Sequence, residues 1–214
     1  MRNYEQLVER WSYSPWREAI EILADANCTK NEFESMIKRL YPDGGDISRS
    51  ETHRGTAELF DCRGVDLSDR DLQNVDFYKI DLSGANFSGA NIDGASFDTA
   101  QLMDTDFSRA LASSNISFVG CFGVRSNFSN VQLVKGIFWG ADLSDSNFFG
   151  ATLDRCDFSN AILTGSNLVG AKMIDCDVQG MRLLEKERDA EWFRQSSFRN
   201  EEHIVWEKEL ESNT

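Results

Sequence analysis

Histidine, proline and positive charge are all scarce in this 214-residue chain. It has two prolines and two histidines, His53 and His203, which lie far apart. We therefore expect neither a His-rich metal site nor a catalytic pair of histidines. The 22 Lys and Arg residues face 36 Asp and Glu residues, giving a net charge of −14. This balance argues against direct binding of nucleic acid through phosphate contacts, and against a membrane contact made by basic residues.

Long apolar runs are also missing. No stretch approaches the roughly 18 apolar residues of a membrane helix, and the segment Met1–Glu5 runs into charges instead of the apolar core of a signal peptide. The cysteines are odd in number and include no Cys-x-x-Cys motif, which is typical of reduced thiols. We expect a cytoplasmic protein without a disulfide framework or a zinc site. The five cysteines are Cys28, Cys62, Cys121, Cys156 and Cys176.

A five-residue repeat dominates the middle of the chain. Pentads such as Ala85-Asn-Phe-Ser-Gly and Ala141-Asp-Leu-Ser-Asp carry a large apolar residue, here called the centre, two positions after a small one. The centres run from Leu67 to Leu183, with a slip of one residue near Asn115. A period of five fits neither a helix nor a strand. It indicates a chain that turns a corner every five residues, so that four pentads complete a square coil.

The identity of every fourth centre supports the square coil. Centres four pentads apart lie on the same side of the coil, and on two opposite sides they are mostly Phe. The two sides between them are aliphatic, apart from Ala112 and Gly123. Because these two small centres flank Phe118, we expect a depleted core layer there, and we expect the inserted residue near Asn115 to form a bulge. One aromatic side reads Phe77, Phe97, Phe118, Phe138 and Phe158, and the opposite side reads Leu67, Phe87, Phe107, Phe128, Phe148 and Leu168.

This repeat is similar to that of the pentapeptide-repeat family, whose pattern is A(D/N)LXX. The resemblance covers about Val65 to Leu184, over half of the chain. It implies a mainly β fold, a right-handed quadrilateral β-helix of about six coils that forms a rod roughly 29 Å long. The expected organisation is a helical N-terminal segment (1–42), a linker with a degenerate first coil (43–64), the β-helix (65–184) and a helical C-terminal cap (185–214).

Both ends of the chain have helical signals. Ser14-Pro15 and Thr29–Glu32 match helix starts. In the tail, segments 185–194 and 201–211 have helical composition. A solenoid exposes the core of its last coil and needs a cap, so we interpret the tail as a cap. Alternatively, its second helix also forms a two-fold homodimer contact. The candidate cap and dimer residues are Trp192, Phe193, Ile204, Val205, Trp206 and Leu210.

The acidity of the repeat has two interpretations. All fifteen acids in 65–184 are Asp, and most precede a centre, where Asn also occurs. Asp and Asn both accept backbone N–H bonds in turns, so the pattern fits turn chemistry. The resemblance instead implies mimicry of duplex DNA, as in the acidic quinolone-resistance members that protect gyrase, with DNA gyrase or topoisomerase IV as partner. Mimicry requires the charge to gather on one or two sides. The candidate acidic surface is Asp66, Asp71, Asp76, Asp81, Asp106, Asp142 and Asp157.

Apolar residues at outward positions form the second candidate surface. Segment 110–124 has no charged residue, and Phe122 stands where a corner Asp or Asn is expected. Such residues on an acidic rod suggest a partner contact, unless a loop folds back and covers them. The candidates are Val119 and Trp139, one coil apart, Ile137 beside Trp139, Phe122, and the second pair Phe149 and Val169.

No arrangement of residues points to catalysis or to a cofactor. Cys156 and Cys176 occupy small inward positions one coil apart, near disulfide distance, and we interpret them as core residues. The sequence shows no Ser/His/Asp or Cys/His constellation, no glycine-rich phosphate loop and no metal-ligand spacing. We expect a non-enzymatic interaction protein, either a DNA mimic directed at a topoisomerase or a rigid scaffold or immunity-type protein. The latter would bind one partner through its apolar patches or helical ends.

Overall fold

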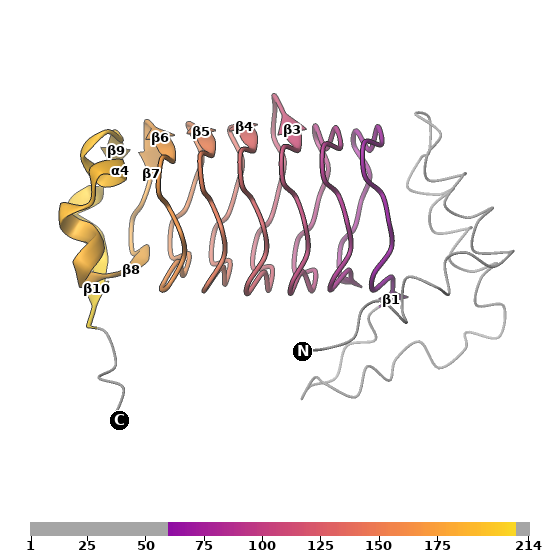
Figure 1. Ribbon diagram of the computed structural model, residues 1–214, viewed down its shortest axis with the longest axis horizontal. Helices are drawn as coiled ribbons and strands as arrows, with labels where there is room; N and C mark the ends of the chain where they lie inside the picture. The colour runs from indigo at the N-terminus through magenta and orange to yellow at the C-terminus, as the bar shows by residue number, and fades with distance from the viewer. Residues whose placement is uncertain (1–59, 209–214) are drawn as a thin grey trace, which may run out of the picture.

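The computed structural model describes residues 60–208, and these wind into a rod of stacked coils with the tail across its last coil (Figure 1). The rod is the predicted right-handed quadrilateral β-helix. Each coil pairs with the next in parallel, so the sheets run along the rod, as in the four-stranded sheet β3-β4-β5-β6. The helices predicted before residue 43, and the linker as far as residue 59, lie outside the described residues.

The strands are short because each side of a coil holds only a few residues between two corners. Isolated parallel bridges continue the same columns between the strands. The strands are β1 (Phe60–Asp61), β2 (Ile80–Asp81), β3 (Leu111–Ala112), β4 (Gln132–Val134), β5 (Thr152–Asp154), β6 (Lys172–Ile174), β7 (Cys176–Asp177), β8 (Arg182–Leu184), β9 (Phe198–Arg199) and β10 (Val205–Glu207). β1 pairs with β2, so the chain enters the first coil at residue 60.

The pairing register shows where the extra residue sits. Asn91 pairs with Leu111, twenty positions on, whereas Ser96 pairs with Ser117, twenty-one positions on. Asn115 lies between these two pairs and has a φ of 44°, a left-handed conformation that Asn tolerates better than most residues. The predicted bulge is therefore confirmed, and the columns stay aligned on both sides of it.

Two opposed columns of phenylalanine fill the core, and they define the Phe138 side and the Phe148 side of the rod. Rings stack within a column and meet edge to face between columns, two arrangements that aromatic pairs favour. Phe118 stacks on Phe97 at 5.0 Å and on Phe138 at 4.8 Å between ring centroids. Its edge contacts, with Phe107 and Phe128, are both at 5.5 Å. The aromatic core thus continues through the bulge without a break.

The core layer beside Phe118 is packed, so the predicted depletion there is wrong. A Cβ built on Gly123 would come within 2.9 Å of Leu143 Cδ2 and of Ser126 Oγ. These neighbouring side chains occupy the space that the glycine leaves. Ala112 is buried as well. The volume is supplied across coils, which the identity of a single centre does not reveal.

Most corners are tight turns whose third residue is left-handed. The Phe87 C=O accepts a bond from the Ala90 N–H at 3.1 Å, and Gly89 between them has a φ of 69°, as a type II turn requires. Where Asn or Asp takes the left-handed place, the same corner of the next coil is often Gly. A Cβ on Gly180 would lie 2.6 Å from Asn160 Oδ1. The other such pairs are Asp69 and Gly89, Asn74 and Gly94, Asn130 and Gly150, and Asp145 and Gly165.

Thr99 is a poor residue for its corner, and replacing it should stabilise the rod. It is β-branched at a φ of 55°, and its buried Oγ1 has no hydrogen-bond partner. Because Gly120 occupies the next corner, Thr99→Asn would restore the Asn–Gly pair. We expect the free energy of unfolding to rise by about 1 kcal/mol. Chemical denaturation followed by circular dichroism measures this change, with Gly94→Ala as the matched destabilising control. A lower midpoint for Thr99→Asn would contradict the prediction.

The tail wraps over the last coil. A 3-10 helix, Glu185–Asp189, leads into the short α-helix α4 (Glu191–Arg194), which buries Trp192. β9 then pairs with β7 and β10 pairs with β8, so the tail extends two sides of the rod. The prediction of a second tail helix over 201–211 is wrong for the described residues. They form a 3-10 turn (Glu201–His203) and β10 instead. The open edge of β8 offers backbone partners, and strand pairing satisfies them.

Candidate functional site

Most of the aspartates that precede a centre serve as turn acceptors. In each, Oδ1 accepts the backbone N–H two residues on, for example from Ser108 to Asp106 at 2.8 Å. Asn147 and the other asparagines in this position accept the same bond, which therefore needs an oxygen but no charge. Asp71 differs, because it accepts from the Gln73 side chain. The seven turn acceptors are Asp66, Asp76, Asp81, Asp106, Asp142, Asp157 and Asp177.

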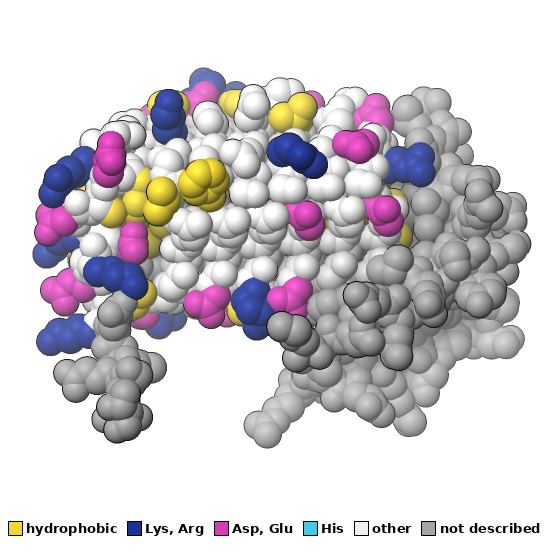
Figure 2. Space-filling view, in the orientation of Figure 1, with side chains coloured by type: hydrophobic (Ala, Val, Ile, Leu, Met, Phe, Trp, Pro, Cys, Tyr) yellow, Lys and Arg dark blue, Asp and Glu magenta, His cyan; other side chains and the backbone are white. Residues whose placement is uncertain are grey.

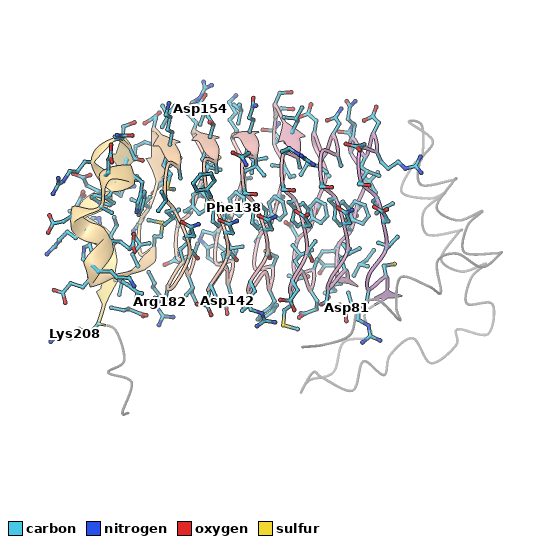
Figure 3. All side chains as sticks on the ribbon, in the orientation of Figure 1. Asp81, Phe138, Asp142, Asp154, Arg182 and Lys208 are labelled. Carbon is cyan, nitrogen blue, oxygen red and sulfur yellow. The ribbon has the colours of Figure 1, made fainter. Side chains whose placement is uncertain are left out.

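Negative charge is spread around the rod. When each Asp of 65–184 is assigned to its nearest centre, the four sides carry three, four, four and four of them. Figure 3 shows Asp154 and Asp142 on opposite sides of the rod, and in Figure 2 acidic and basic side chains alternate without a continuous acidic band. Arg125 also holds Asp104 through two bonds of 2.7 and 2.8 Å. The described residues therefore do not gather charge on one or two sides, as mimicry of DNA requires.

Apolar side chains are exposed around one corner of the rod. On the Phe138 side, Ile137 is 37% and Trp139 51% exposed, and Phe122, just past the corner on the next side, is 50% exposed. Val119 is half-buried and lies one coil before Trp139, whose C=O accepts the Gly120 N–H at 2.9 Å. We call Val119, Phe122, Ile137 and Trp139 the corner patch. Its aromatic side chains are exposed, and no loop among residues 60–208 covers them.

Two glycines make the corner patch a single surface. Gly120 and Gly140 take the corner place in successive coils, with φ values of 60° and 65°. A Cβ built on Gly140 would meet nothing within 4 Å. Because no side chain stands on this corner, a partner could contact Trp139 on one side of the rod and Phe122 on the next.

Phe149 and Val169 form a separate surface. They are 49% and 62% exposed, but they follow centres of the Phe148 side, opposite the Phe138 side. Beside them runs a neutral column in which Asn167 Nδ2 donates to Asn147 Oδ1 at 3.1 Å. The structure thus brings together four of the six predicted partner-contact residues and separates the other two.

Three carboxylates border the corner patch along the rod, each one coil before or after one of its residues. Asp157 pairs with Ile137 and Asp142 with Phe122. Asp98 accepts the Val119 N–H of the next coil at 3.0 Å instead of a turn bond in its own coil. The sequence prediction missed it because it follows a centre. Its place one coil before Val119 in the same column was the available signal.

The charges near this corner affect the pKa of the thiol of Cys121, the residue that follows Gly120. Burial raises the pKa of the Cys121 thiol, and the negative charges of Asp98 and Asp142 raise it further. On the Phe138 side, Lys135 and Arg155 stand at its other corner, and Arg155 binds Asp154 at 2.8 Å. Lys79 stands in the column of the glycine corner, one coil before Asp98. The edge of the patch at the glycine corner is therefore acidic.

The candidate tail residues are mostly used in capping the rod. Trp192 and Ile204 are buried, and Phe193 and Trp206 are half-buried with ring centroids 5.5 Å apart. Val205 is 46% exposed, and Leu210 lies outside the described residues. Among the described tail candidates, Val205 is the most exposed and offers apolar surface to a second molecule.

The described residues add no sign of other chemistry. Cys156 and Cys176 are free, buried and on adjacent coils, and the Cys176 thiol donates to the Leu153 C=O at 3.3 Å. Within residues 60–208, no group of three or more His, Cys, Asp or Glu side chains could hold a metal ion. None of the helices in that range is long and apolar enough to cross a membrane.

Comparison with known proteins gives one family. A family model described as "Pentapeptide repeats" matches in eight copies over residues 61–98, 80–113, 126–165 and 141–180, just over half of the chain. No curated protein matches the chain.

Three solved structures illustrate the similarity. A trypsin-treated variant of QnrB1, a plasmid-mediated fluoroquinolone resistance protein, is 19% identical, covers 69% of this chain and 80% of its own, and has a TM-score of 0.42. HetL is involved in heterocyst differentiation regulation in the cyanobacterium Nostoc sp. strain PCC 7120. It is 19% identical, covers 62% of this chain and 81% of its own, and has a TM-score of 0.28. Rfr23 from the cyanobacterium Cyanothece 51142 is 20% identical, covers 69% of this chain and 91% of its own, and has a TM-score of 0.34.

Proposed function

Because the chain belongs to the pentapeptide repeat family, we propose that it is a non-enzymatic interaction protein, a rigid rod that binds one protein partner at the corner patch. The observation that carries this proposal is the exposure of Trp139, Phe122 and Ile137 around a bare glycine corner of the rod. Apolar groups of this kind on a monomer surface commonly mark a contact site.

The physical properties of the patch suit binding. Tryptophan and other aromatic side chains supply much of the energy at protein interfaces. The backbone under Trp139 and Ile137 is fixed by ladder bonds to both neighbouring coils, for example from the Ile137 N–H to the Ile116 C=O at 2.9 Å and from the Phe138 N–H to the Asp157 C=O at 2.7 Å. Little backbone entropy is therefore lost when a partner binds.

A type II topoisomerase is the more specific partner that we propose to test. The net charge of −14 supports it, although the spread of Asp over four sides favours contact through side chains of the corner patch over mimicry of a DNA duplex. Supercoiling by DNA gyrase or topoisomerase IV, with and without a fluoroquinolone, measures inhibition and protection. Absence of both at micromolar protein would remove topoisomerases as partners and leave the interaction surface to be tested separately.

We expect Trp139→Ser to abolish capture of the partner from extracts of the native host, while Phe149→Ser leaves it intact. Both changes remove an aromatic side chain of similar exposure, but on opposite sides of the rod. Quantitative mass spectrometry of the captured proteins compares the two variants, and circular dichroism checks that both fold. Equal capture by the two variants would contradict the proposed surface.

Self-association is a further assembly that the sequence predicts and that we keep as a proposal. Among residues 185–208, a two-fold homodimer through the tail would have Val205 as its exposed apolar contact, since the neighbouring Ile204 is buried in the cap. Light scattering on the full chain measures its mass in solution.

A further inference from the structure

Resting on the proposed function, we infer that the partner presents to the corner patch an extended segment with one apolar side chain between two basic ones. The apolar side chain packs on Trp139 and its neighbours. The Lys or Arg side chains on either side of it pair with the carboxylates that border the patch along the rod, Asp98 before it and Asp157 and Asp142 after it.

These carboxylates have an oxygen to offer. In Asp98, Oδ1 accepts the Val119 N–H and the Ser117 hydroxyl. In Asp142 and Asp157, Oδ1 accepts the N–H groups of the residues two positions on, at 3.1 and 2.8 Å. No hydrogen bond from any described residue reaches Oδ2 of the three. A turn bond in Asp142 and Asp157, and bonds from the next coil in Asp98, therefore hold each carboxylate in place through one oxygen and leave the second for a cation.

The spacing of the carboxylates selects an extended segment. Asp98 and Asp157 stand three coil steps apart, with the patch between them, which is about 14 Å along the rod at the usual strand separation. Four residues of extended chain span about 13 Å, and residues i, i+2 and i+4 of such a chain point to one face. A segment of the pattern basic-x-apolar-x-basic therefore matches both the distance and the direction of the side chains.

The sign of the charge excludes other occupants of the same surface. From Ser96 to Gly180 the Phe138 side carries Asp98, Asp157 and Asp177 between its corners and no Lys or Arg. These carboxylates repel a nucleic acid or an anionic lipid surface, whereas an apolar segment without charge would leave them unpaired. A basic segment with an apolar centre is the class of partner that satisfies both parts of the site.

A displayed library of random linear nonapeptides, selected on the immobilised full chain, tests this inference. We expect the enriched peptides to carry the basic-x-apolar-x-basic pattern. The triple variant Asp98→Asn, Asp142→Asn, Asp157→Asn should bind the enriched peptides, made synthetically, about tenfold more weakly, because the exposed ion pairs of both basic side chains, each of modest strength, are lost. Higher salt should weaken binding to the unchanged protein in the same direction.

The chain itself offers a matched control. Asn already accepts the turn bond at positions equivalent to Asp142 and Asp157, such as Asn127 and Asn147. Asn at position 98 still has an oxygen to accept the Val119 N–H, so the triple variant should keep its fold, as its denaturation midpoint will show. A second triple variant, Asp66→Asn, Asp106→Asn, Asp145→Asn, removes the same charge away from the patch and should bind the peptides like the unchanged protein. Equal weakening by both triple variants would overturn the inference in favour of a general charge effect.

The remaining outcomes separate the inference from the proposed function. Enriched peptides that require Trp139 but lack the basic residues, or that bind the patch triple variant undiminished, would overturn the partner class and leave the surface standing. Enriched peptides indifferent to Trp139→Ser, or no enrichment at all, would overturn both.

Discussion

Phe118→Ala is expected to lower the free energy of unfolding by about 3–5 kcal/mol, and by no less than Phe138→Ala does. The Phe118 ring is fully buried and contacts four other phenylalanines, two stacked and two edge to face. Leu143 and Ser126 already fill the space beside Gly123. They are held by their own coils, so they cannot close a new cavity at Phe118.

Chemical denaturation followed by circular dichroism compares the two alanine variants under one set of conditions. Phe118→Leu serves as a control, because it keeps most of the buried volume and should cost much less than the alanine change. A loss for Phe118→Ala that is clearly smaller than for Phe138→Ala would show that the layer at the bulge is loose after all.

The sequence predicts the rod because each pentad of the repeat forms one side of a coil. Each centre from Leu67 to Leu183 points inward, and the bulge at Asn115 follows from counting positions between Phe107 and Phe118. The packing beside Gly123 could not be predicted in this way. It depends on the rotamer of Leu143 in the next coil, and a list of centres contains no information on rotamers.

The candidate surfaces were predictable to different degrees. The outward positions of Trp139 and Phe122 follow from the repeat, but their joining across Gly120 and Gly140 depends on the geometry of the corner. The role of Asp98 was hidden because it binds a residue of the next coil and not its own turn.

The second half of the tail was mispredicted for a different reason. Segment 201–207 has the composition of a helix, yet Val205–Glu207 forms β10 because β8 presents an unpaired strand edge, and Arg182 donates to Glu207 at 2.6 Å across the new pair. Local propensity is weaker than the need to satisfy the backbone at the end of a solenoid.

Removal of residues 185–214 is expected to make the protein aggregate. The deletion uncovers the core at Leu183 and Met173, and it takes away the strands that pair with β7 and β8. An apolar end with unpaired edges invites end-to-end association. Removal of residues 204–214 should act in the same direction but less strongly, because Trp192 stays over the core while β8 loses β10.

Light scattering and thermal denaturation on the truncated chains, beside one that lacks only residues 209–214, measure both effects. We expect the shortest deletion to match the full chain in midpoint and mass. A monodisperse protein with an unchanged midpoint after loss of residues 185–214 would show that the tail does not cap the rod. Val205→Glu separates capping from dimer formation, because Val205 is exposed while Ile204 is buried. If the full chain is a dimer through its tail, this change gives a monomer with an unchanged midpoint, whereas a dimer that survives it does not use this surface.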